Sequence, residues 1–305
     1  MTVFGNLRNE FHLALINSGI LCLTEKKGVL VASNADSSQA LSRDLATSVA
    51  HKIASNVGVQ FSTSNSKQAG QTSGNVFEEV CRDFVEKSFG QLYHLRPGEW
   101  RVEKINSRSR DLIGRFEQYA HLGELNRLAS EHQELKNFLG DGYTVAPDVA
   151  VFRLPEPDEV INQERDIVGS NEATMAALRQ VNHTRDGGSV KDILHASISC
   201  KFTMRSDRAQ NTRTEALNLI RGRKGRVPHI VAITAEPTPS RLSSLAQGTG
   251  DIDCVYHFAL NELVEAMNDY AAKNDAASDS KALLMSMING KRLKDISDLP
   301  LDLSI

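Results

Sequence analysis

The chain has 305 residues, of which 40% are hydrophobic and 24% are charged. This composition is typical of an ordinary soluble globular protein that can bury a substantial core, as one large domain or two small ones. The net charge of -3 gives no general attraction to nucleic acid. No run of eighteen apolar residues occurs, and the N-terminus lacks a charged segment followed by an apolar run, so neither a membrane span nor an export signal is expected.

The first half of the chain is predicted to be mainly helical. Apolar spacing predicts a helix over 40–56, and the polar segment 60–75, rich in Ser, Gly and Gln, is predicted to be a loop. An apolar stripe then predicts an amphipathic helix from Val76 to Phe89, which Asn75 can cap. Periodicity predicts a further helix over roughly 111–139, ended by a Gly-Asp-Gly sequence.

Strands are predicted from residue 143 onward. β-Branched residues predict a strand over 143–154, and the segment 155–192, rich in charge, Asn and Gly, is predicted to leave the core. The remaining predicted elements are strands over 193–204, 228–235 and 254–260 and helices over 208–221 and 261–273. This order indicates an α/β fold with a mixed sheet in a single domain, residues 1–305.

One segment departs from the neutral average. Between Lys201 and Arg226 lie eight basic residues and two acidic ones. A neutral protein with one basic stripe fits a selective phosphate-binding surface better than a nonspecific coat. Taken alone, the stripe is better explained as a solvated helix face.

The cysteines predict the redox environment. Their spacing fits neither a CxxC metal pair nor a disulfide framework; they are Cys22, Cys81, Cys200 and Cys254. Buried free thiols in a reducing cytosol are therefore expected.

An aspartate and a lysine at the ends of predicted strands are candidates for phosphodiester chemistry. Period-two alternation places Lys201 on the face opposite Ile198 and Cys200, where it can either snorkel or point into a site. Asp148 begins an apolar strand, where a carboxylate is costly to bury without a metal or a partner, although Pro-Asp is also a common turn. On neighbouring strands the two form the skeleton of a metal-dependent phosphodiesterase, in which the carboxylate binds Mg²⁺ and the lysine orients the attacking water.

Two glutamates could complete such a site. Many nucleases of this type carry an acid two positions before the lysine, where this chain has Ser199. Glu215 can restore the missing carboxylate if its helix packs across the strand ends, but it could also be a surface acid. Glu78 follows the polar segment, yet Asn75 and Glu78 also have the spacing of a capping box, in which Glu78 would bond the Asn75 amide.

Three residues at a predicted helix start are suited to recognising bases. Arg205 and Arg208 could place their guanidinium groups in a groove while the helix N-terminus faces phosphate. Arginine donates bidentately to O6 and N7 of guanine, and a carboxylate such as that of Asp207 accepts from N4 of cytosine. The cluster therefore suits consecutive G·C pairs, and a salt-bridged helix cap is the alternative.

Motifs spread through nearly the whole chain carry a family resemblance. They are SNADSS at 33–38, GQTSGNVFE at 70–78, Pro147-Asp148, SISCKFTMRSDRAQNTRTE at 197–215, GRVPHI at 225–230, AEPTPSR at 235–241 and NGKRLKDISDLPLDLS at 289–304. In these motifs the chain resembles the NgoMIV family of type II restriction endonucleases, which belong to the PD-(D/E)xK nucleases and cut at or around a CCGG core. The combination is far more specific than a PD…SxK pattern alone.

The resemblance implies a role for each candidate residue. Asp148, Lys201 and Glu215 would form the catalytic core. Ser199 would stand where the usual acid is, and Glu78 would be an additional active-site carboxylate, which favours catalysis over capping. The implied DNA contacts are Arg205, Asp207 and Arg208 to the inner C·G pairs, Asp36 and Arg241 with Ser38 nearby to the outer G·C pair, and Gln71 in the minor groove.

The resemblance also implies a fold, a cofactor and an assembly. The expected fold is restriction-endonuclease-like, with a central mixed sheet flanked by helices. Two Mg²⁺ ions per active site, four-base 5′ overhangs and a homotetramer of two back-to-back dimers are expected, in the bacterial cytoplasm. The chain departs from the family mainly at 57–70 and 155–192.

The resulting hypothesis is a Mg²⁺-dependent type II restriction endonuclease that cuts GCCGGC after the first G. One alternative is a repair or junction nuclease of the same fold, which would recognise shape instead of bases. Another is a DNA-binding regulator without catalysis, in which Asp148 is structural. Mg²⁺-dependent loss of intact plasmid distinguishes an enzyme from a regulator.

Overall fold

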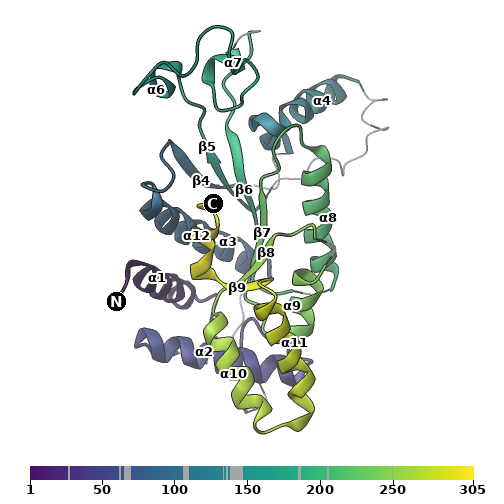
Figure 1. The fold of residues 1–305 in the computed structure, drawn as a ribbon. Coiled ribbons are helices and arrows are strands. Elements are labelled where there is room, and N and C mark those ends of the chain that lie inside the picture. Colours follow the sequence, from purple (N-terminus) through teal and green to yellow (C-terminus); the bar gives the residue numbers. More distant parts are fainter. Residues whose placement is uncertain are drawn as a thin grey trace.

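The computed structural model describes residues 1–26, 28–61, 63–64, 70–105, 110–132, 134, 137, 147–184, 187–204, 206–248 and 250–305. These residues form a six-stranded sheet and a smaller three-stranded sheet with helices around them (Figure 1). The helices are α1 (Val3–Asn17), α2 (Ala40–Val57), α3 (Gly70–Phe89), α4 (Ala120–Glu131), α6 (Asp158–Ile161), α7 (Gln180–Thr184), α8 (Ser206–Gly222), α9 (Pro239–Ala246), α10 (Leu260–Ala271), α11 (Ser278–Asn289) and α12 (Leu299–Asp302). None of the helices in these ranges could span a bilayer.

The large sheet is mixed, as predicted. Its order is β4 (Trp100–Lys104), β5 (Val149–Arg153), β6 (Ile193–Lys201), β7 (His229–Thr234), β8 (Cys254–His257) and β9 (Leu293–Asp295). The β4–β5 and β5–β6 pairs are antiparallel, and the pairs from β6 to β9 are parallel. The inner strands β7 and β8 are almost wholly buried because helices cover both faces of the sheet.

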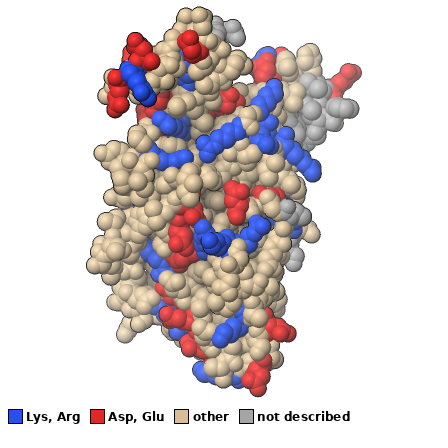
Figure 2. Space-filling model, viewed as in Figure 1, with Lys and Arg blue, Asp and Glu red and all other residues tan. Residues whose placement is uncertain are grey.

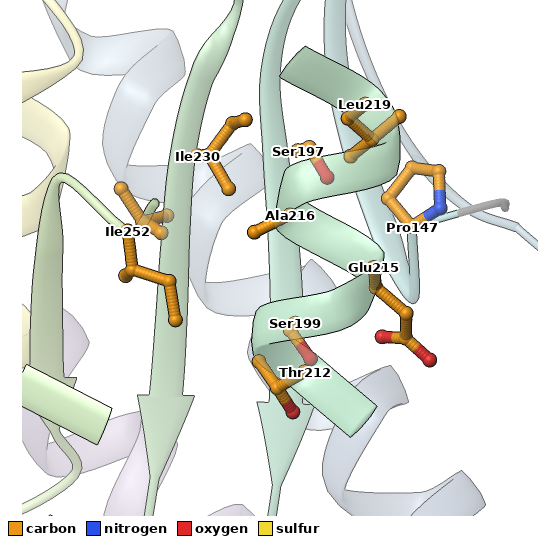
Figure 3. A pocket seen from close by; sticks show the side chains of 10 residues that line it. Pro147, Ser197, Ser199, Thr212, Glu215, Ala216, Leu219, Ile230 and Ile252 are labelled. Atoms are coloured by element: carbon orange, nitrogen blue, oxygen red, sulfur yellow. The ribbon is translucent and has the colours of Figure 1, made fainter. Parts of the chain in front are cut away.

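Helices lie on both sides of the large sheet in Figure 1, with α1, α3 and α12 on one side and α8, α9 and α11 on the other. The predicted alternation of β6 is confirmed, since Ile198, Cys200 and Phe202 are buried. Phe202 packs against Phe77 of α3, with ring centroids 5.5 Å apart. The opposite face of β6, which carries Ser197, faces α8 (Figure 3).

The smaller sheet lies in the N-terminal part of the chain. It consists of β1 (Leu23–Lys26), β2 (Val29–Ala32) and β3 (Thr63–Ser64), with β1 in the middle. No strand was predicted there. The sequence patterns also failed to predict α1, β4, α9, α11, β9 and α12, and the segment 236–241, which reads as a loop, contains the start of α9 at Pro239. All four cysteines are buried and free, as expected.

The start of α3 differs from its prediction. The helix begins at Gly70 instead of Val76, so the predicted loop is wrong for residues 70–75 and Asn75 lies inside the helix. The Asn75 carbonyl accepts a hydrogen bond from Lys104 of β4 at 2.8 Å. The capping-box interpretation of Asn75 and Glu78 is therefore wrong.

The single helix predicted over 111–139 is also wrong. Two 3₁₀ turns, η2 (Arg110–Arg115) and η3 (Glu117–Tyr119), precede α4, and the predicted Gly-Asp-Gly end lies outside the described residues. Phe116, extended and fully buried, separates the two turns and pairs with Asp192 in a β-bridge. A tertiary contact therefore overrides the local helical pattern.

The segment 155–192 leaves the sheet between β5 and β6, as predicted, and carries α6 and α7 beyond the end of the sheet (Figure 1). The buried guanidinium of Arg179 holds it together by bonding Asp158 at 2.6 and 2.7 Å. All four predicted strands are shorter than predicted. β5 covers Val149–Arg153, with the predicted residues 143–146 outside the described ranges; β6 ends at Lys201, β7 covers His229–Thr234 and β8 ends at His257.

Candidate active site

Asp148 and Lys201 meet where β5 begins and β6 ends. Because the two strands are antiparallel, with Val149 opposite Ile198, the residue before β5 lies beside the end of β6. Lys201 Nζ lies 2.9 Å from Asp148 Oδ2, and the Cys200 backbone N–H donates to the same oxygen at 2.7 Å. Ser199 Oγ lies 3.4 Å from it. The carboxylate is thereby held in one orientation at the edge of the site.

Lys201 keeps its positive charge. Burial alone would lower the pKa of Lys201, but the carboxylates of Asp148 and Glu215 outweigh burial and raise that pKa. The side chains of Lys201 and Asp148 are each 20% exposed, so the pair can still be reached from solvent. A permanent ammonium group therefore stands beside the Asp148 carboxylate.

Glu215 reaches the same site from α8. It lines a small cavity with Pro147, Ser199 and Thr212, and Figure 3 shows its side chain projecting from α8 beside them. Burial raises the pKa of Glu215, and the charge of Asp148 adds to that increase while Lys201 opposes it. The packing of α8 across β6 thus produces the proximity that the sequence prediction required.

Glu78 comes from the opposite side, on α3. Burial and the charge of Asp148 raise the pKa of Glu78, against the opposing effect of Lys104. Lys104 Nζ lies 3.3 Å from Glu78 Oε2 while it also bonds the Asn75 carbonyl. Lys104 is a site residue that the sequence analysis missed, because nothing in the short strand WRVEK marks its lysine as special.

The donor set suits a hard divalent cation. Glu78 and Glu215 both have pKa values that are raised first by burial and also by the negative charge of Asp148, so each glutamate lies close enough to Asp148 to be repelled by it. Carboxylate oxygens are the ligands that Mg²⁺ prefers, and a cation would relieve this repulsion. Among the residues that the structure describes, no group of three acidic, His or Cys side chains is already close enough to hold a metal ion.

The predicted contacts to the outer base pair lie together. Arg241 of α9 forms an ion pair with Asp36, and Ser38 donates to Asp36 Oδ1 from its hydroxyl at 2.7 Å and its amide at 3.0 Å. Hydrogen bonds from Ser38, together with the guanidinium of Arg241, hold the pKa of Asp36 well below its usual range. Arg241 also donates to the Met204 carbonyl at 3.0 Å, which connects this cluster to the chain just beyond β6.

The other predicted base contacts are placed only by their backbone. Asp207 and Arg208 lie in the first turn of α8, and Gln71 lies in the first turn of α3. Arg205 and the side chains of the other three residues are outside what the structure describes. α8 begins at Ser206, shortly after β6 ends at Lys201. The backbone of Asp207 and Arg208 therefore lies near the strand end that carries Lys201.

A partly buried aspartate–lysine pair at the junction of antiparallel and parallel strands, with glutamates from two helices beside it, defines the class of restriction-endonuclease-like nucleases. The family model of the NgoMIV restriction enzyme matches residues 11–305. The type II restriction enzyme NgoMIV of Neisseria gonorrhoeae is 48% identical over 303 residues, which cover 99% of each chain. The chain therefore belongs to the NgoMIV restriction enzyme family and is a type II restriction endonuclease, a site-specific DNA nuclease.

Solved structures of two other restriction endonucleases are more distantly similar. Bse634I with cognate DNA is 14% identical, with a TM-score of 0.36 over 84% of this chain and 98% of that one. PspGI in a substrate DNA complex is 13% identical, with a TM-score of 0.35 over 99% of this chain and 92% of that one. Scores this low add nothing to the assignment, which depends on the sequence match.

Proposed function

We propose that this endonuclease cuts both strands of DNA at GCCGGC, after the first G, and leaves 5′ CCGG overhangs with 5′ phosphates. The convergence of Asp148, Lys201, Glu215 and Glu78 from two strands and two helices is the observation that carries the proposal. The choice of GCCGGC is supported by the motifs shared with the family in the segments that would contact the bases.

In the proposed chemistry, Asp148 and Glu215 hold the cofactor and Glu78 supports a second ion or the water network. Bound Mg²⁺ would supply a water of lowered pKa and positive charge against the phosphate. Lys201 orients the attacking water and opposes the charge that develops on the phosphate. Ser199 and the Cys200 amide keep the Asp148 carboxylate aimed at the site.

The proposed base recognition uses two groups of residues. Arg205, Asp207 and Arg208 would contact the inner C·G pairs in the major groove. Asp36 and Arg241 would contact the outer G·C pair, with Ser38 beside them and Gln71 in the minor groove. The ion pair between Arg241 and Asp36 supports this role. A guanidinium can donate to O6 and N7 of guanine, and a neighbouring carboxylate can accept from N4 of cytosine.

The remaining expectations complete the proposal. They are a single domain of residues 1–305, two Mg²⁺ ions per active site, double-stranded DNA as the partner, a homotetramer, and action in the bacterial cytoplasm. Buried free cysteines fit a reducing compartment. Sedimentation analysis would test the assembly, since a tetramer has four times the 33.5 kDa of one chain.

The test uses two plasmids, one with GCCGGC sites and one with CCGG sites in other flanks, each incubated with Mg²⁺ or with EDTA. Cutting of only the first plasmid, abolished by EDTA and leaving CCGG overhangs by end sequencing, is the expected result. Cutting of both would remove the outer-pair assignment of Asp36 and Arg241. Binding without cutting would overturn the catalytic assignment.

A further inference from the structure

Glu236 is a buried carboxylate directly after β7, and the active-site chemistry described above does not use it. Its side chain is 1% exposed. One carboxylate oxygen accepts the Met204 backbone N–H at 3.1 Å, and the other accepts the Thr238 backbone N–H, also at 3.1 Å. Arg241 Nη1 lies 3.6 Å from the same carboxylate.

The neighbouring contacts place Met204 between two fixed groups. Its N–H is held by Glu236, and its carbonyl is held by Arg241. That carbonyl belongs to the peptide group of Arg205, the first residue of the proposed inner-pair segment. Arg241, for its part, is paired with Asp36 in the proposed outer-pair cluster.

A charged side chain at this position works against folding. Burial raises the pKa of Glu236, so the protein environment disfavours the carboxylate form that accepts both amides. A well-packed apolar side chain would fill the space at a lower desolvation cost. The carboxylate is therefore better explained by what it positions than by stability.

We propose that Glu236 is a specificity-determining positioning residue that couples recognition of the inner and outer base pairs. One oxygen of this buried carboxylate, Oε2, accepts the N–H of Met204, the residue before the segment 205–208, and the same oxygen lies beside the guanidinium of Arg241. A mismatch that moves either group is then transmitted to the other through Glu236 and Met204. This inference rests on the proposed recognition of GCCGGC.

The experiment compares Glu236→Gln with a matched control, Glu262→Gln. Glu262 is equally buried, at 2% exposure, and is also paired with an arginine, Arg8, but its contacts are with α1 and α2. For each protein, kcat/KM is measured on duplexes with GCCGGC, with the outer pair changed (ACCGGT) and with the innermost pair changed (GCTAGC). Binding of the same duplexes in EDTA gives a second measure of discrimination.

For Glu236→Gln we expect discrimination to fall by about tenfold at both the outer and the innermost pair, because the amide can accept only one of the two N–H groups. Glu262→Gln should keep the wild-type ratios. If Glu236→Gln slows all three duplexes equally, Glu236 is merely structural and the inference is wrong. If Glu236→Gln loses discrimination at the outer pair alone, Glu236 does not couple the two pairs and the inference is also wrong.

A second variant covers the case in which Glu236→Gln does not fold. Glu236→Asp keeps the charge but shortens its reach, and a smaller loss of about threefold at both pairs is expected. Unchanged ratios in Glu236→Asp would then overturn the inference. If the wild-type protein cuts GCCGGC but the variants discriminate normally, the inference alone fails; if the wild type does not cut GCCGGC, the proposed function fails with it.

Discussion

The Lys201 ammonium stays charged in a partly buried site because two carboxylates face it. If it orients the attacking water, Lys201→Met should lower the single-turnover rate on GCCGGC by about 100- to 1000-fold, with folding retained. Lys52→Met is the control, because Lys52 also bonds two acids, Glu265 and Asp269, but on the α2–α10 surface. A Lys201→Met protein that cuts at the wild-type rate with Mg²⁺ would exclude the proposed role.

Substituting two adjacent glutamates on α3, Glu78 and Glu79, distinguishes a role in the active site from a general effect on the helix. Glu78 is half-buried beside Lys104 and within the influence of Asp148, whereas Glu79 is exposed. Glu78→Gln should lower the cleavage rate by about 10- to 100-fold, as is usual for groups that support a metal site. Glu79→Gln should leave the rate unchanged, and equal effects in the two variants would contradict a role for Glu78. The same rates measured at increasing Mg²⁺ concentration would show whether added cofactor restores the Glu78 variant.

The site residues that could be predicted from the sequence are those whose local pattern shows their position. Alternation along β6 and the aspartate before β5 predicted the contact between Asp148 and Lys201. Lys104 and Glu236 could not be predicted, because each has a partner, Glu78 for Lys104 and Met204 for Glu236, that becomes its neighbour only when separate elements pack together. Glu236 stands in a Pro- and Thr-rich segment that has the composition of an ordinary loop.

At the scale of elements, the packing of α3 on β6 brings Glu78 to Lys201. Phe77 and Phe202, each adjacent in sequence to one of those residues, form the contact between the two elements. Phe77→Ala should lower the free energy of unfolding by about 3–5 kcal/mol, because it leaves a cavity under the helix. Urea unfolding measures this loss. Tyr93→Ala is the control: its side chain is 72% exposed and should change stability by less than about 0.5 kcal/mol, and a similar loss in both variants would exclude a special contact.

Helices and strands were predicted well where a local sequence pattern determines them, and less well where a contact with a distant part of the chain determines where they begin or end. The buried strands β6, β7 and β8 have apolar runs with turn signals, and all three were predicted. The start of α3 was missed because residues 70–75 are polar and have the composition of a loop. The break before α4 was missed because Phe116 pairs with Asp192.

For the whole molecule, the described part of the basic stripe predicted between Lys201 and Arg226 does not form one continuous surface. Arg213 pairs with Asp251, and the Arg223 guanidinium turns back to the Ile220 carbonyl. The stripe also spans the full length of α8, so its two ends lie at opposite ends of the helix. Figure 2 shows basic side chains gathered across the upper part of the face drawn there, with acidic side chains mostly above and below them. Phosphate contacts are therefore expected mainly from the N-terminal end of α8, next to the active site.

His195 joins distant parts of the molecule, because it lies on β6 and bonds the Leu303 carbonyl at 2.7 Å. Burial lowers the pKa of His195 to about 3, and the nearby charges of His229 and Arg96 add to that effect. In the unfolded chain the ring takes up a proton near pH 6.5, whereas in the folded chain it stays neutral. The stability that it contributes is therefore complete above pH 6.5 and is lost as the pH falls from there toward 3.

The difference in the free energy of unfolding between the wild type and His195→Asn, called the gap here, isolates the effect of this histidine from that of carboxylates that titrate in the same pH range. The variant should be less stable at pH 7.5, since the packing around the ring is lost. Below pH 6.5 the gap should narrow by about 1.4 kcal/mol per pH unit, because only the wild type loses stability through this histidine. Urea unfolding in EDTA at pH 7.5, 6.5 and 5.5 measures the gap, and a gap that stays constant would show that the pKa of His195 is the same in the folded and the unfolded protein.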